Sequence, residues 1–299
     1  MRNDCWLRLS LFGGAALARL SPPQAPQVLP LCTQSRNLLV CLALARGGTR
    51  SRSQLAQALS NAEAEPAPAA SLSSALWRLR CTLESPPFKA GDLLTKKGDG
   101  QVGLRTDAPL HIDVESYLQL VLPVLALPLE AVDAAATEQL RRGAALYVGD
   151  LLPGALDDWV LREREKLRHH QLNALGRLVS LSVRANDAAA GVRYAEAILD
   201  IDELREDVHR DLMRLLLLAG QRAQALRQYE RCRLVLRREL SIVPMPETQA
   251  LYRQIVAGAV SEHAGAPTLP TPPWVELLGD ARRHLAAADA QLLRALPRP

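Results

Sequence analysis

Apolar residues recur at helical spacing over residues 71–83, the clearest such pattern in the amino-terminal third of the chain. One face of the predicted helix carries leucines at positions i, i+4, i+7 and i+11, namely Leu72, Leu76, Leu79 and Leu83. The opposite face is polar, with Ser71, Ser74, Arg78 and Thr82 flanked by Trp77 and Arg80. Arginine and serine are side chains with which a helix contacts DNA in the major groove, although an ordinary amphipathic surface helix shows the same pattern.

Short strands and helices surround this helix in a definite order. The pattern predicts strands over 6–12, 16–20 and 28–31, a helix over 33–45 capped by Thr33, a short helix that begins at Ser51, and strands over 93–96 and 101–105. The last two strands are joined by a tight-turn sequence at 97–100. Strands, three helices and a hairpin in this order are the plan of a winged helix-turn-helix domain, with 71–83 in the recognition position.

The second half of the chain contains a repeat. Residues 188–201 and 223–236 match at an offset of 35 and share Ala188/Ala223, Ala190/Ala225, Tyr194/Tyr229 and Leu199/Leu234. Small residues at a helix crossing and a period of about 34 residues are typical of tetratricopeptide-like helix pairs. Such pairs are expected to stack as a short solenoid over 156–258, in which the two tyrosines are packing residues.

Charge is distributed unevenly along the chain. Residues 1–110 hold 13 Lys and Arg against 7 Asp and Glu, whereas residues 111–299 hold 23 against 25. The predicted hairpin carries Lys96, Lys97 and Arg105, which suits a wing that touches phosphates, although a solvated hairpin would look the same. A basic amino-terminal third on a near-neutral remainder favours a polyanion-binding head on a protein-binding body.

Several classes of protein find no support in the sequence. The five cysteines are odd in number and include no CxxC pair, which argues against a metal site or a disulfide framework and favours a reducing cytoplasm. No stretch approaches the roughly 18 apolar residues of a membrane span. His169 and His170 are expected to be a solvated pair, and Asp157 and Asp158 to be charges at a helix N-terminus. The sequence therefore predicts no enzyme, no cofactor and no contact with a membrane.

Two long, ordered segments resemble the bacterial transcriptional activator domain. The first is LYVGDLLPG at 146–154 with DDWV at 157–160 and Glu163-Arg164, and the second is RREL at 237–240 running into Pro244 and PET at 246–248. The segment HIDV at 111–114 is similar to the junction that follows the wing in this family. The match covers about residues 6–260, and the chain resembles transcription factors of the antibiotic-regulatory-protein (SARP) type.

The resemblance implies a mainly α protein with a winged helix-turn-helix domain of the response-regulator type (α+β), followed by an all-α tetratricopeptide-like domain. We expect the winged helix over 1–110 and the activator domain over 111–260. Residues 261–299 lie outside the resemblance and comprise a Pro-rich linker and an added helix over 274–296.

The resemblance also implies a set of DNA-contacting residues and partners. Ser74, Trp77, Arg78 and Arg80 occupy positions that face DNA, while Arg52, Lys96 and Lys97 are candidates for backbone contacts. Ser71 and Arg105 complete the predicted interface. Family members bind direct repeats of double-stranded DNA as tandem protomers and recruit RNA polymerase through its sigma or another subunit.

Three positions depart from the family pattern. Val102 replaces the usual wing aromatic, Cys81 stands where a basic residue is common, and Trp77 is bulky where a small or basic residue is common. The first two motivate a second interpretation, a helical adaptor whose winged helix does not read DNA. A repressor that senses a small molecule in the solenoid groove is a third interpretation, but the sequence shows no polar cluster for it.

Overall fold

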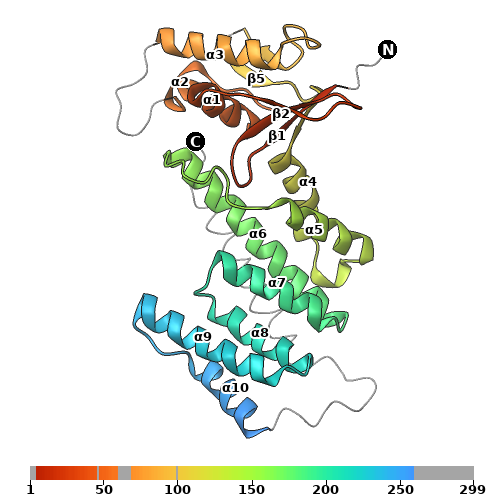
Figure 1. Ribbon diagram of the computed structural model, residues 1–299, viewed down its shortest axis with the longest axis vertical. Coiled ribbons are helices and arrows are strands. Elements are labelled where there is room, and N and C mark those ends of the chain that lie inside the picture. The colour runs from red at the N-terminus through yellow and green to blue at the C-terminus, as the bar shows by residue number, and fades with distance from the viewer. Residues whose placement is uncertain (1–4, 46, 60–68, 99, 259–299) are drawn as a thin grey trace. The chain divides into compact units, whose positions relative to one another are not determined.

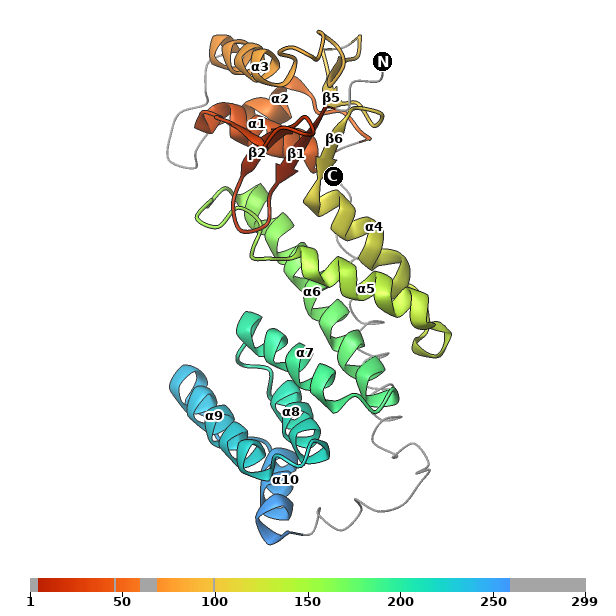
Figure 2. The ribbon, with the colours of Figure 1, turned by 45° about the vertical axis from the view of Figure 1, so that its right-hand side comes forward.

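The computed structural model describes residues 5–45, 47–59, 69–98 and 100–258 of the 299-residue chain (Figures 1 and 2). The chain divides into two compact units, Met1–Pro244 and Met245–Pro299. Among the described residues, helices predominate and strands are confined to the amino-terminal part, so the predicted fold class is confirmed. The predicted linker and the helix over 274–296 lie outside the described residues. Within the described part, none of the helices combines the length and apolar character that a membrane crossing requires.

A four-stranded sheet opens the first unit, in the order β3–β2–β1–β6. Its strands are β1 (Trp6–Ser10), β2 (Ala16–Leu20), β3 (Gln27–Leu29) and β6 (Leu110–Ile112). The third strand ends earlier than predicted, before Pro30, which has no N–H for the ladder. Strand β6 is absent from the prediction; it pairs in parallel with β1, and Leu9 lies opposite Ile112. Strand β6 spans residue 110, where the boundary between the two domains was predicted, and the position of this boundary stays a prediction.

Three helices and a hairpin complete the amino-terminal part: α1 (Thr33–Ala43), α2 (Arg52–Gln57), α3 (Ala69–Leu83), β4 (Leu94–Lys96) and β5 (Val102–Leu104). Ser51 begins α2 with a capping box in which it exchanges hydrogen bonds with Gln54. The predicted cap of α1 was wrong. Thr33 is already the first residue of the helix, so Cys32 is the N-cap residue. The Cys32 side chain makes no cap hydrogen bond.

The hairpin β4–β5 is fastened to the segment before α2. Arg50 and Val102 exchange both main-chain hydrogen bonds, at N–O distances of 2.8 and 3.0 Å. A Cβ atom on Gly103 would lie 2.6 Å from the Gly48 carbonyl oxygen, so the close approach of these two segments requires glycine. Val102, at the position of the usual wing aromatic, is the first residue of β5 and is buried.

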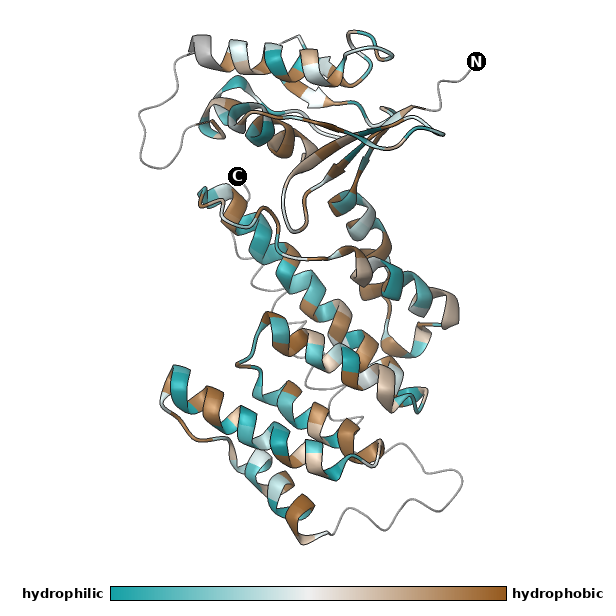
Figure 3. Ribbon diagram, viewed as in Figure 1, coloured by the Kyte–Doolittle hydropathy of each residue, from teal (hydrophilic) through white to brown (hydrophobic). Residues whose placement is uncertain are grey.

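The helical body consists of α4 (Asp113–Leu125), the 3₁₀ turn η1 (Leu129–Ala131), α5 (Ala134–Leu146), α6 (Asp158–Arg184), α7 (Ala188–Ile201), α8 (Glu206–Leu218) and α9 (Arg222–Leu240). From α4 to α9, each helix packs against the next. Figure 3 shows apolar and polar residues alternating along these helices, as amphipathic packing requires.

Small residues lie at the helix crossings, as the repeat predicts. A Cβ atom on Gly191 of α7 would lie 2.8 Å from Cδ2 of Leu215 in α8. Tyr229 is a buried packing residue, which confirms its predicted role. The Tyr194 ring is half-buried, and its hydroxyl accepts a hydrogen bond from Nε of Arg141 in α5 at 3.1 Å.

The second unit is described through α10 (Pro246–Ala257). Pro246 occupies the first helical position, where its fixed φ suits the helix and its missing N–H costs nothing. Gly258 ends the helix in a left-handed conformation with φ of 75°.

Candidate nucleic-acid interface

Helix α3 buries its leucine face and exposes the opposite one. Leu72, Leu79 and Leu83 are at most 2% exposed, which confirms three of the four positions of the predicted stripe, whereas Leu76 is only half-buried. The exposed face is lined by Ser73, Ser74, Trp77 and Arg78 around an open hollow of about 390 Å³. Three of the predicted contact residues therefore lie together. The backbone of Ser71 belongs to the same helix, but its side chain is not among the described ones.

Arg78 is exposed but fixed in direction. Its Nη2 donates to Oε1 of Gln34 in α1 at 2.8 Å, and its Nε donates to the Ser74 carbonyl oxygen at 3.4 Å. A guanidinium group has five N–H donors in a planar fork, so these two bonds leave others for an external acceptor. A held fork of this kind can bind a phosphate or the edge of a guanine.

Arg52 lies between α3 and the turn of the hairpin. Its Nη2 donates to Oγ of Ser73 at 2.9 Å. Its aliphatic stem lies beside Gly100, where an added Cβ atom would be 3.7 Å from Cδ of Arg52. Arg52 therefore links the three elements from which the interface was predicted: α2, α3 and the wing.

Arg80 points to an internal partner. Its Nε lies 3.3 Å from Oε2 of Glu84, whose side chain is only 2% exposed. The other oxygen of Glu84 accepts hydrogen bonds from the amides of Gly91, Leu93 and Leu94, at 2.9, 3.3 and 3.0 Å. Arg80 thus compensates a buried carboxylate that holds the segment leading into β4.

The three basic residues of the hairpin differ in their surroundings. Arg105 forms a two-pronged pair with Asp107, at N–O distances of 2.9 and 2.6 Å, and this pair lowers the pKa of Asp107. Lys96 and Lys97 are exposed and form no ion pair with the residues that the structure describes. They are therefore the hairpin cations that remain available to an external anion.

The electrostatic character of this region is uniform. Helices α1, α2 and α3 contain four arginines (Arg36, Arg52, Arg78 and Arg80) and no aspartate or glutamate. Charges of one sign on neighbouring elements add to a potential that attracts a polyanion. The surface formed by Arg52, Ser73, Ser74, Trp77 and Arg78 is called the α3 face below.

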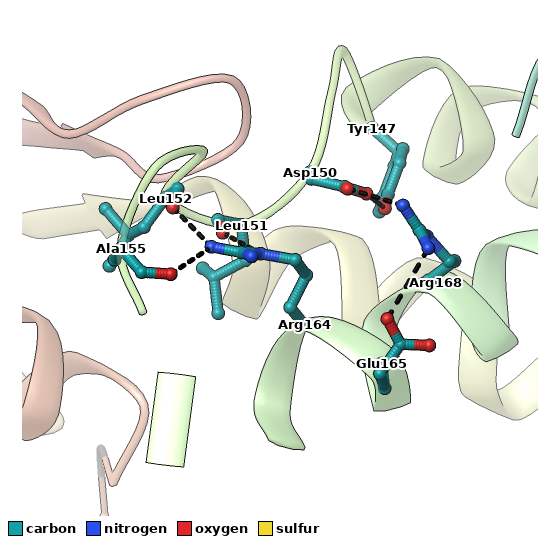
Figure 4. A network of polar contacts seen from close by, with 8 residues as sticks. All are labelled: Tyr147, Asp150, Leu151, Leu152, Ala155, Arg164, Glu165 and Arg168. Atoms are coloured by element: carbon teal, nitrogen blue, oxygen red, sulfur yellow. Dashed lines mark hydrogen bonds and ion pairs between the residues drawn. The ribbon is translucent and has the colours of Figure 1, made fainter. Parts of the chain in front are cut away.

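A second cluster of polar residues lies at the start of α6 (Figure 4). Arg164 donates to the carbonyl oxygens of Leu151, Leu152 and Ala155, at 2.8, 2.6 and 3.0 Å. Asp150 accepts from the Tyr147 hydroxyl at 2.6 Å and from Arg168 at 2.7 Å. Burial is the main reason why the pKa of Tyr147 is raised, and Asp150 raises it further.

This cluster joins the helical body to the end of β1. The Gly13 amide donates to the Asp150 carbonyl at 2.9 Å, and the Leu152 amide donates to the Leu11 carbonyl at 3.2 Å. The Asp113 carboxylate, at the start of α4, accepts from the amides of Leu11 and Phe12 at 2.7 and 3.1 Å. The sequence drew attention to these segments only through the resemblance, and their contacts with β1 could not be predicted from spacing.

A model of the family described as bacterial transcriptional activator domain matches residues 112–256. The match covers 145 of the 299 residues, from β6 to α10, and this part of the chain is similar to that domain. The chain is 27% identical over 224 residues to regulatory protein AfsR of Streptomyces coelicolor, a match that covers 75% of the chain and 22% of AfsR. The chain thus spans about a fifth of that relative's length.

The fold is that of a known structure. EmbR of Mycobacterium tuberculosis, solved in complex with a low affinity phosphopeptide, matches with a TM-score of 0.69 at 18% identity, over 95% of this chain and 72% of EmbR. The family match and the similarity to AfsR confirm the resemblance to SARP-type proteins, and the match to EmbR confirms the fold.

The charged pairs singled out in the activator domain lie on α6. Asp157 is the N-cap residue and Asp158 is in the first turn, as predicted for helix N-terminal charges. His169 is exposed beside Asn173, with Nε2 and Nδ2 2.9 Å apart, as expected of a solvated side chain. His170 is half-buried, and this burial lowers its pKa, so the prediction of a fully solvated pair was wrong for this residue.

Proposed function

We propose that the chain is a sequence-specific DNA-binding transcription regulator that acts as an activator in the cytoplasm, without catalysis. The observation that carries this proposal is the α3 face. It is an exposed helix surface with two directed arginines, and none of α1, α2 and α3 contains a carboxylate. A protein surface of this composition suits the phosphates and base edges of a DNA major groove.

Affinity and selection are expected to come from different residues. Arg52, Lys96 and Lys97 neutralise phosphates, which releases counterions and makes binding steeply dependent on salt. Helix α3 selects the sequence, with Ser74 and the Arg78 fork directed at base edges. Gln34 keeps the Arg78 guanidinium in one orientation, which lowers the entropy lost on binding.

The helical body is proposed to act on proteins. Tandem protomers occupy direct repeats, whose half-sites follow the DNA helical repeat of about 10–11 base pairs. The activator domain then contacts the second protomer and RNA polymerase. This step is supported by the family of residues 112–256.

The test is binding of the full chain to duplexes selected from a random pool, measured by fluorescence anisotropy over a range of salt. Arg78→Ala is expected to weaken the selected duplex by about 1–3 kcal/mol, the usual range for one bidentate base contact. Arg162→Ala is the matched control, because Arg162 is exposed on α6 and is not part of the α3 face. Arg162→Ala should bind as the unaltered protein does.

The same measurement separates the adaptor interpretation from the regulator. Selection of no sequence, with affinity that changes little between low and high salt, would refute the proposed function and favour the adaptor. Genome-wide capture of DNA bound to the tagged chain in its own cell, paralleled by Arg78→Ala, then names the promoters.

A further inference from the structure

Trp77 is the most unusual residue of the α3 face. Its side chain is 67% exposed, and it is the only Trp, Tyr or Phe in the exposed class among the residues that the structure describes. It lines the open hollow with Ser73, Ser74 and Arg78. Tryptophan side chains are enriched at surfaces that contact other molecules, because they combine a large apolar face with a polar N–H group.

The surroundings of Trp77 leave the indole accessible. Side chains on a helix lean toward its N-terminus, so the indole extends toward Ser73 and Ser74, one turn earlier. Both serines are short, and the Ser73 hydroxyl is already engaged by Arg52. Arg78 follows directly and is turned toward Gln34. Two arginines are therefore held near Trp77: Arg52 by Ser73, one turn before Trp77, and Arg78 by Gln34 at the next position of the helix.

The charge of this surface identifies the class of partner. None of α1, α2 and α3 contributes a carboxylate, so an anionic partner is favoured. A duplex presents phosphates on either side of a groove and base edges between them, which suits a surface that combines two arginines with an exposed aromatic ring. In the major groove, the 5-methyl group of thymine is the apolar feature by which base pairs are distinguished.

We propose that Trp77 reads a thymine, by covering its 5-methyl group, at one position of each half-site. The inference rests on the proposed DNA binding and adds a specificity-determining residue to it. Trp77 supplies apolar contact at this position, while Arg52 and Arg78 fix the register of the helix on the duplex. A cytosine or a uracil at the same position leaves the indole without its methyl partner.

The experiment replaces each thymine of the selected duplex, one at a time, with deoxyuridine. This change removes one methyl group and keeps every hydrogen-bonding group of the base. With the unaltered full chain, one replacement per half-site is expected to weaken binding about fourfold, the effect of one buried methyl group. Trp77→Ala should bind the thymine duplex about tenfold more weakly and no longer distinguish it from the deoxyuridine duplex.

Lys97→Ala is the matched control, because a phosphate contact should weaken both duplexes equally and keep their ratio. Circular dichroism verifies that Trp77→Ala is folded, as expected for an exposed side chain. Selective binding with no methyl effect, or a methyl effect that persists in Trp77→Ala, would overturn the inference and leave the proposed function intact. Failure of the unaltered chain to select any duplex would overturn both.

Discussion

The hydrogen bonds of Arg164 give a quantitative test of how the helical body is joined to β1. Replacing Arg164 with methionine keeps much of the apolar stem and removes every donor. Three bonds to main-chain carbonyls are lost, at 2.6–3.0 Å in the structure. At roughly 1 kcal/mol net for each hydrogen bond, the local free energy of unfolding should fall by about 3 kcal/mol.

Amide hydrogen exchange measures this change where it occurs. The amides of Gly13 and Leu152 donate in the hydrogen bonds between the segment that follows β1 and the segment that Arg164 holds, so their exchange should accelerate on the order of a hundredfold. The Leu7 amide, which donates to Pro109 across the sheet, should change much less. Arg162→Met, on the exposed part of the same helix, is the control. A change of less than about 0.5 kcal/mol at Gly13 and Leu152 would refute the reasoning.

Three further changes have definite expected outcomes. Gly191→Ala should lower the free energy of unfolding, measured in urea, by about 1–3 kcal/mol, because the new Cβ atom would lie 2.8 Å from Cδ2 of Leu215. Gly98→Ala is the control and should be near neutral, because no atom lies within 4 Å of its new Cβ atom. Burial lowers the pKa of His209, so the unfolded chain binds more protons than the folded one, and the free energy of unfolding should decline as pH falls below about 6.5. This decline should be less steep in His209→Gln. The same pH dependence in the variant and the unaltered chain would contradict the prediction. The Ser35 hydroxyl, 3.2 Å from Sγ of Cys32, lowers the pKa of the Cys32 thiol. Ser35→Ala should therefore slow the alkylation of Cys32 by iodoacetamide near neutral pH, and an equal or faster rate would contradict this.

The elements that the sequence predicted well are those whose signal is local. Helix α3 has its leucines on one face, and α7 spans the predicted residues 188–201 because capping and periodicity act within a few turns. Strand β6 was missed because three residues carry no periodicity of their own and become a strand only by pairing with β1, about a hundred residues earlier. The cap of α1 was misplaced by one residue, which is the usual uncertainty of a helix end.

The candidate site shows the same division. That Trp77 and Arg78 share an exposed face follows from helical spacing alone, whereas the bond from Arg78 to Gln34 depends on how α1 packs on α3. The partner of Arg80 was visible in the sequence, since Glu84 stands four residues later, a spacing typical of ion pairs on a helix. What spacing could not indicate is the burial of Glu84, which explains why Arg80 turns toward it.

The segments that identified the activator domain owe their composition to the atoms they bind. The side chains of Asp113 and Arg164 bind main-chain atoms. Any residue can supply the main-chain atom in such a contact, whatever its side chain. The contacting residue must be an Arg or an Asp, because only its side chain has the required donors or acceptors. The domain is therefore recognisable from its polar residues, while the residues whose main chain they contact have no signature of their own. Contacts of this kind could be located only once the chain was folded.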